Sequence, residues 1–217
     1  MKYNTILFDL DGTLTDPAEG ITKSVAFSLD AYGVPYESLD ALRPFIGPPL
    51  REQFMKYTGF DVNTGEAMVE KYREYYAVTG IYENKVYDGI PEMLETLKKA
   101  GKTLAVATSK PERFAKIILE HFNISHYFDI CAGANIDNTR TDKAEVIQYA
   151  IEMLNKNSKS DRIVMVGDRR HDIIGAKKNS IECIGVTFGY GSVEELENAN
   201  ADIIVNSVTE LCNTLMQ

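Results

Sequence analysis

The chain has 217 residues, of which 25% are charged and 44% hydrophobic, enough for one hydrophobic core or for a core with a smaller second domain. Its formal net charge of -9 argues against a nucleic-acid-binding surface, because contacts with phosphates need clustered lysines and arginines. The opening residues lack a signal-peptide pattern, and no segment approaches the roughly 18 consecutive apolar residues that span a membrane. We therefore expect a cytoplasmic protein with no membrane or nucleic-acid partner.

The first strand is expected over Thr5–Phe8, a continuous apolar run that suits a strand buried on both faces of a parallel sheet. Asp9 and Asp11 follow this run, and Gly12 breaks it. Open α/β sheets bind ligands at the carboxyl ends of their strands, so the two acids would lie at the mouth of a ligand crevice. Closely spaced carboxylates attract a divalent cation, and their hard oxygens favour magnesium over zinc. The alternative for this segment alone is a strand that runs into an acidic turn.

The segment between Pro17 and Glu83 has a helical pattern and lacks strand signals. Prolines and glycines punctuate it, since proline suits a first helical turn and glycine suits a helix end. Asn63 and Glu66 have the spacing of a capping box, which predicts a helix start at Asn63. Helical pieces are expected over residues 17–33, 38–45, 48–59 and 63–76.

From residue 85 onward, expected helices and strands alternate. Repeated βα units of this length predict a parallel sheet with helices on both faces. Strands are expected over residues 103–107, 128–132, 162–166, 181–186 and 203–205. Helices are expected over residues 91–100, 111–122, 142–154 and 172–178, with two more starting at the capping-box residues Ser192 and Ser207.

The expected fold class is therefore α/β, a doubly wound, Rossmann-like parallel sheet with an inserted all-helical cap domain. Residues 1–15 and 84–217 would form the discontinuous core, and residues 16–83 the insert, with hinges where the chain crosses between them. Substrate specificity is expected from the insert, in which Arg51 is the candidate for substrate contact. The alternative for Arg51 is an exposed position in a first helical turn.

Two further segments carry groups that suit an anionic ligand. The expected strand over residues 103–107 is followed by Thr108, Ser109 and a helix start, so hydroxyls and free backbone N–H groups could hold a phosphate. Ser109 has an alternative role as a helix cap, because Glu112 stands three residues later. Lys143 falls in a first helical turn, where the helix dipole disfavours a cation. It has either a functional role or the position of an ordinary exposed lysine.

A second acidic pair follows the expected strand over residues 162–166. Asp168 comes after a glycine that allows close backbone approach, and Asp172 falls in the first turn of the next helix. Asp168 would thus lie at the same edge of the sheet as Asp9. The GYGS turn over residues 189–192 is expected only to connect a strand to a helix, and no GxxxxGK[ST] phosphate loop occurs in the chain.

These segments resemble the motifs of the haloacid dehalogenase superfamily of phosphohydrolases, in its phosphoglycolate phosphatase and β-phosphoglucomutase branch. DLDGTLTD is similar to the DxDGT signature, VATSKP to the second motif, TDKAEV to the lysine motif and VGDRRHD to the GDxxxD motif. The motifs occur in the family's order, with a helical insert after the first, as in the family's C1 caps. The resemblance covers the whole chain.

By this resemblance, Asp9 is the nucleophile that forms an aspartyl-phosphate. Asp11 is the acid/base that protonates the leaving oxygen and then activates water. Thr108 and Lys143 would hold the phosphoryl group. Because a carboxylate and a phosphate are both negative, a cation must neutralise their approach.

The resemblance also implies a magnesium ion, bound by Asp9, the backbone carbonyl of Asp11, and Asp168. Asp172 would support the ion's waters and orient Lys143. The helical insert would close the site against water.

The expected function is a magnesium-dependent phosphatase for a small phosphate monoester, similar to a phosphoglycolate phosphatase or a 5'-nucleotidase. Its partner would be a small phosphorylated metabolite. A β-phosphoglucomutase-like phosphotransferase or a pyrophosphatase would use the same motifs, and a non-catalytic ligand-binding module could keep the same fold. The full set of acids together with Lys143 favours an enzyme, because a binding module has no chemical need for all of them.

Overall fold

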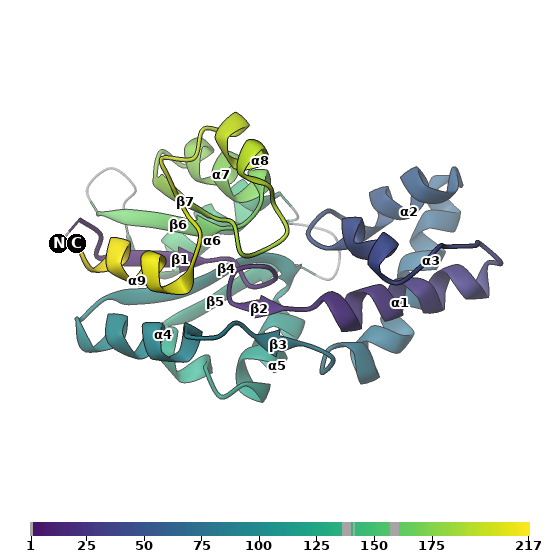
Figure 1. The fold of residues 1–217 in the computed structure, drawn as a ribbon, viewed down its shortest axis with the longest axis horizontal. Coiled ribbons are helices and arrows are strands. Elements are labelled where there is room, and N and C mark those ends of the chain that lie inside the picture. The colour runs from purple at the N-terminus through teal and green to yellow at the C-terminus, as the bar shows by residue number, and fades with distance from the viewer. Residues whose placement is uncertain (1, 136–139, 141, 157–160) are drawn as a thin grey trace. The chain divides into compact units, whose positions relative to one another are not determined.

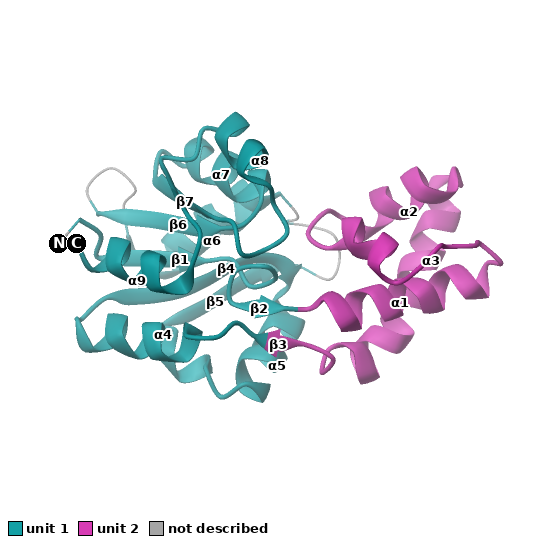
Figure 2. Cartoon of the chain, viewed as in Figure 1, with its two compact units in different colours: residues 1–16, 86–217 teal, residues 17–85 magenta. Residues whose placement is uncertain are grey.

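The computed structural model describes residues 2–135, 140, 142–156 and 161–217. The chain divides into two compact units, of which unit 1 comprises Met1–Asp16 and Val86–Gln217, and unit 2 comprises Pro17–Lys85 (Figure 2). The insert expected from the sequence covers residues 16–83, whereas unit 2 covers residues 17–85. In the described part of the chain, no helix combines the length and the apolar character needed to cross a membrane.

Unit 1 is built on a six-stranded sheet with the strand order β5-β4-β1-β6-β7-β8, in which the neighbouring strands pair in parallel. This confirms the predicted α/β class and the doubly wound parallel sheet. The strands are β1 (Thr5–Phe8), β4 (Thr103–Pro111), β5 (Ile130–Ala134), β6 (Ile163–Gly167), β7 (Glu182–Val186) and β8 (Ile203–Val205).

Helices cover both faces of this sheet, with α4 and α9 on one face and α6 and α7 on the other (Figure 1). One cluster of buried side chains joins β1, β6 and α6, and it includes Leu7, Met165 and Ile147. The helices of unit 1 are α4 (Ile90–Lys99), α5 (Glu112–His121), the 3-10 helix η3 (Ser125–Tyr127), α6 (Lys143–Met153), α7 (Arg170–Lys178), α8 (Val193–Asn198) and α9 (Val208–Met216).

Strand β1 lies in the middle of the sheet and is buried along its whole length, as its apolar sequence predicts. Phe8, its last residue, is in register with Val106 of β4 and Val166 of β6. Because the three strands are parallel, residues that follow these positions in each strand come together at one edge of the sheet. That edge carries the candidate site.

Unit 2 is mainly helical. It contains α1 (Ala18–Ala31), the 3-10 helix η1 (Asp40–Phe45), α2 (Leu50–Thr58), α3 (Val62–Tyr75) and the π-helix η2 (Tyr76–Gly80). The chain crosses between the units at β2 (Thr15–Asp16) and β3 (Lys85–Val86), which pair as a separate two-stranded sheet.

Three helix caps differ in how well the sequence predicts them. The helix starts predicted at Ser192 and Ser207 are confirmed, since each serine caps its helix by accepting a hydrogen bond from the amide three residues later. The predicted start of α3 at Asn63 is wrong, because Asp61 caps this helix by accepting from the Thr64 amide at 2.8 Å. A carboxylate at Asp61 competes well for the orphan amides of the first turn, so the helix begins earlier.

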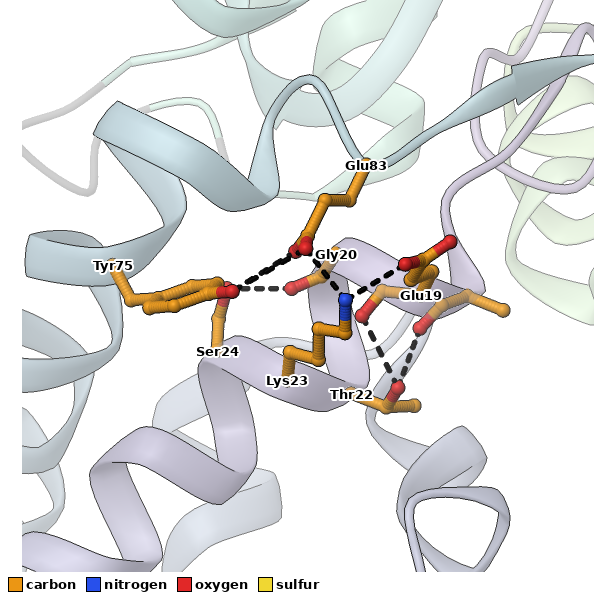
Figure 3. A network of polar contacts seen from close by, with 8 residues as sticks. Glu19, Gly20, Thr22, Lys23, Ser24, Tyr75 and Glu83 are labelled. Carbon is orange, nitrogen blue, oxygen red and sulfur yellow. Dashed lines mark hydrogen bonds and ion pairs between the residues drawn. The ribbon is translucent and has the colours of Figure 1, made fainter.

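A polar network fastens the first helix of unit 2 to the end of the same unit (Figure 3). The Lys23 ammonium donates to Glu19 Oε1 at 2.7 Å and to Glu83 Oε1 at 2.6 Å. The Tyr75 hydroxyl lies 3.3 Å from both carboxylate oxygens of Glu83. The Gly20 amide also donates to the Glu83 carbonyl at 2.9 Å. These contacts hold the two ends of the insert together within unit 2.

Candidate active site

Asp9 and Asp11 lie directly after β1 in a tight loop. The Gly12 amide donates to the Thr15 carbonyl at 2.7 Å, and Gly12 adopts a positive φ of 81°. A Cβ atom at Gly12 would lie 2.2 Å from Asp168 Oδ2, so a larger residue would collide with this carboxylate. Glycine at position 12 therefore allows both the positive φ of the turn and the close approach of Asp168.

Lys143 is the first residue of α6 and is almost completely buried, with its side chain 4% exposed. Its ammonium forms ion pairs with Asp9 Oδ1 and Asp172 Oδ1, each at 2.8 Å. Burial alone would lower the pKa of Lys143, but Asp172 and Asp9 outweigh it and raise this pKa above its ordinary value. Lys143 is thus a charged lysine between two carboxylates and does not have the exposed position that was its alternative.

Asp9, Asp168 and Asp172 form the candidate metal cluster, because each offers a carboxylate oxygen within 4.8 Å of the others. Burial, and then the charges of Asp172 and Asp9, raise the pKa of Asp168 well above its usual range. Burial likewise raises the pKa of Asp172. Clustered carboxylates of this kind need a cation to stabilise their ionised forms. The donor set consists of hard oxygens, which fits a divalent cation.

Lys110 also belongs to this site, a role that was not predicted from the sequence. Its ammonium lies 2.6 Å from Asp11 Oδ2, and its side chain is only 7% exposed. Burial raises the pKa of Asp11, and Lys110 offsets part of this rise. The signal in the sequence is that Lys110 stands two residues after Thr108, because alternate residues of a strand share a face.

Thr108 and Ser109 lie in β4, which extends further than predicted. Thr108 is buried, and its hydroxyl accepts from the Lys110 amide at 3.2 Å. The alternative role of Ser109 as a helix cap is wrong, because the capping position of α5 is Pro111 and no side chain bonds there. The reason is that β4 continues past Ser109, shifts register, and pairs Pro111 with Ala134. Phosphate binding by Thr108 and Ser109 stays a prediction.

Arg51 lies in α2 of unit 2, where it forms an exposed ion pair with Glu66 Oε1 at 3.0 Å. Exposed pairs of this kind contribute little to stability, so the guanidinium can exchange partners at low cost. Its role in substrate specificity stays a prediction.

The GYGS turn connects β7 to α8, as expected, but it also contacts the acidic cluster. The Tyr190 amide donates to Asp168 Oδ2 at 2.8 Å. The Tyr190 hydroxyl donates to Asp16 Oδ1. Burial and the Asp16 carboxylate raise the pKa of the Tyr190 phenol, so the phenol stays protonated and remains a donor.

The family model for haloacid dehalogenase-like hydrolases matches residues 6–186 of this chain. The chain belongs to this family. The match confirms the resemblance identified from the four motifs, and it includes every candidate site residue of both units. The chain is therefore an enzyme of a hydrolase family, and its acidic cluster is compatible with the divalent metal that the family uses.

Three similar proteins illustrate the range of the family. A 5'-nucleotidase of Pseudomonas aeruginosa is 48% identical over 196 residues, covering 90% of this chain and 88% of the relative. The tyrosine-protein kinase PtkA of Mycobacterium tuberculosis is 38% identical over 204 residues, covering 94% of this chain and 69% of the relative. A crystal structure described as a predicted phosphatase from Clostridium acetobutylicum is 51% identical with a TM-score of 0.94, covering 99% of this chain and 98% of that one. The similarity to the crystal structure thus extends over nearly the whole length of both chains.

Proposed function

We propose that this hydrolase is a magnesium-dependent phosphatase that cleaves a small phosphate monoester through an aspartyl-phosphate on Asp9. The observation that carries the proposal is the pairing of two buried lysines with the two acids that follow β1. Lys143 lies 2.8 Å from Asp9, and Lys110 lies 2.6 Å from Asp11. The 5'-nucleotidase and phosphatase names of similar proteins support the same reaction class.

In the first step, Asp9 attacks the phosphorus atom, an Asp9 O–P bond forms, and the P–O bond to the leaving alcohol breaks. Both reactants are negative, so the Lys143 ammonium beside Asp9 lowers the electrostatic cost of the approach. Asp11 donates its proton to the leaving oxygen. Burial raises the pKa of Asp11 and so favours the protonated form that this step needs.

In the second step, Asp11, now ionised, removes a proton from water. The water oxygen bonds to phosphorus, the Asp9 O–P bond breaks, and orthophosphate leaves. Thr108 and Lys143 would hold the phosphoryl oxygens through both steps, because a hydroxyl and an ammonium donate to the charge that develops on them.

Asp9, the Asp11 carbonyl and Asp168 would bind the magnesium ion, and Asp172 would orient Lys143. Bound there, the ion would neutralise charge on the phosphoryl oxygens. Magnesium is proposed ahead of zinc because the donors are oxygens and no cysteine or histidine belongs to the described cluster. The substrate is proposed to be a small phosphorylated metabolite, and the cytoplasmic location expected from the sequence stays a prediction.

The test is phosphate release from nucleoside 5'-monophosphates, phosphoglycolate, sugar phosphates and an aryl phosphate, with and without magnesium. We expect magnesium-dependent release that Asp9→Asn abolishes. The matched control is Asp129→Asn, since Asp129 accepts from Lys98 and from the Leu104 amide away from the site. Unchanged turnover in Asp9→Asn, or no release from any ester by folded, magnesium-loaded protein, would contradict the proposal.

A second candidate is phosphoryl transfer to a protein tyrosine, which the identity of 38% to PtkA favours. The same aspartate chemistry would then take phosphate from a nucleoside triphosphate. Adding ATP labelled at the γ-phosphate distinguishes the two, because a kinase labels protein while a phosphatase releases orthophosphate. Adding pyrophosphate to the panel tests the pyrophosphatase alternative, and following the isomerisation of a hexose phosphate tests the mutase alternative.

A further inference from the structure

The segment Gly189–Gly191, between β7 and α8, packs against both acidic segments of the proposed site. A Cβ atom at Gly189 would lie 2.2 Å from the Gly12 carbonyl oxygen and 2.5 Å from Asp168 Oδ2. A Cβ atom at Gly191 would lie 1.9 Å from the Asp168 carbonyl oxygen. No larger side chain fits at either position, so these glycines let the backbone contact the acid directly.

Tyr190, between the two glycines, forms hydrogen bonds with two different aspartates. Its amide donates to Asp168 Oδ2 at 2.8 Å, which orients this carboxylate. Its phenol donates to Asp16, which is in β2 and is the last residue of unit 1 before the chain enters unit 2. The amide and the phenol belong to one residue, so the phenol bond limits where the amide can lie.

The neighbouring aromatic residues restrict this segment further. Phe188 packs edge to face against Tyr87, with ring centroids 5.4 Å apart. The Tyr87 phenol is also within bonding reach of Tyr190. Tyr190 is therefore held by packing in a partly buried environment, where its hydrogen bond to a carboxylate is stronger than at a fully exposed site.

We propose that Tyr190 is a positioning residue for the metal site: its amide fixes Asp168, and its bond to Asp16 fixes the amide, so that breaking the Tyr190–Asp16 bond weakens magnesium binding. This inference rests on the proposed function. Neither Tyr190 nor Asp16 is assigned a contact with the metal or with the substrate. The bond would also make metal affinity depend on the position of β2, where the chain crosses to unit 2.

The test is the magnesium dissociation constant, measured by calorimetry with magnesium chloride and no substrate. Tyr190→Phe keeps the ring and loses the phenol, and we expect it to bind magnesium about tenfold more weakly, since a hydrogen bond to a charged group is lost. Asp16→Ala should weaken binding to the same extent. The double variant should be no weaker than either single variant, because both changes break one bond. Asp16→Asn keeps an acceptor and should bind close to native affinity.

A matched control is Tyr3→Phe, because the buried Tyr3 also donates its phenol to a carboxylate, that of Glu182, at 2.6 Å. Tyr3 precedes β1 and lies at the opposite edge of the sheet from the site, so this change should leave the magnesium constant at its native value. A phosphate-release assay gives a second readout. Tyr190→Phe should need about tenfold more magnesium and then reach a near-native rate, whereas general structural damage lowers the rate at every concentration.

Native affinity in Tyr190→Phe would overturn the inference, and so would a double variant whose losses multiply. If Tyr190→Phe does not fold, the comparison of Asp16→Ala with Asp16→Asn still decides, because only the first loses the bond. A failure of the proposed function would look different, since the native chain would then release no phosphate from any ester, even where it binds magnesium.

Discussion

At the scale of single residues, the candidate site is a nearly balanced set of charges. Four carboxylates, those of Asp9, Asp11, Asp168 and Asp172, meet two buried lysines, which leaves two negative charges in excess when all groups are ionised. A divalent cation would balance this excess. Each lysine thus matters for the charge of the set as well as for its own contact.

The change Lys110→Met tests the residue that sequence reasoning missed. Lys110 lies 2.6 Å from Asp11 in a site that excludes most water. Removing it leaves a buried carboxylate without its partner, so we expect kcat/KM to fall by about 100-fold, in the range seen when one stabilising group is lost. Steady-state kinetics on the best ester of the panel gives the measurement.

The control for this prediction is Lys116→Met. Lys116 pairs with Glu112 at 2.7 Å, but its side chain is 55% exposed. Such pairs contribute little, so kcat/KM should stay within about twofold of native. Equal kinetics in the two variants would show that Lys110 has no special place in the site.

At the scale of elements, the sequence predicts the sheet well because buried strands and amphipathic helices have clear periods. It predicts Asp9 and Asp168 as neighbours because parallel strands end at one edge, whereas Lys143, in a first helical turn, is placed beside them only by the family resemblance. Prediction from the sequence fails where contacts between distant segments decide the local structure. The extension of β4 beyond Thr108 depends on pairing with β5, and the contact of Tyr190 with Asp168 depends on the packing of the β7–α8 turn.

Asp202, just before β8, links two elements and gives a prediction about acid stability. It accepts from Lys177 at 2.5 Å and from the Cys183 amide at 2.9 Å. Burial alone would raise the pKa of Asp202, but these bonds outweigh it and lower the pKa below its ordinary value. A lowered folded-state pKa adds stability above the unfolded pKa, near 3.9, and this stability is lost as the pH falls through the folded value.

We therefore expect Asp202→Asn to lower the free energy of unfolding near neutral pH by about 1 kcal/mol, discounted for partial exposure. Below about pH 4 the difference from the native chain should shrink, because Asp202 is then protonated first in the unfolded state and, at lower pH, in the folded state too. Urea unfolding at several pH values measures this. Glu95→Gln is the control, since Glu95 forms only an exposed ion pair with Lys99. This variant should change neither the free energy of unfolding nor its dependence on pH. A difference that grows in acid would contradict the argument.

At the scale of the whole molecule, the proposed metal site predicts that stability depends on magnesium. A ligand that binds only the folded state adds about 2.7 kcal/mol at 100 times its dissociation constant. We expect magnesium to raise the thermal midpoint of the native chain and to leave that of Asp168→Asn unchanged. Without metal, Asp168→Asn should unfold at a higher temperature than the native chain, because one of three mutually repelling carboxylates is gone.

Scanning calorimetry with and without magnesium measures both effects. Asp129→Asn again serves as the control and should keep the native shift, since Asp129 bonds to Lys98 and Leu104. A full magnesium shift in Asp168→Asn would remove this residue from the metal site.

The central place of β1 in the sheet also affects how the chain acquires its fold during synthesis. Strand β1, which Asp9 follows directly, leaves the ribosome before both of its neighbours, which begin at Thr103 and Ile163. At about 5–20 residues per second, the second neighbour follows roughly ten seconds or more later. Unit 2 is continuous in sequence and can close on itself during this interval. Strand β1 must therefore stay unaggregated until both of its partners in the sheet have been translated.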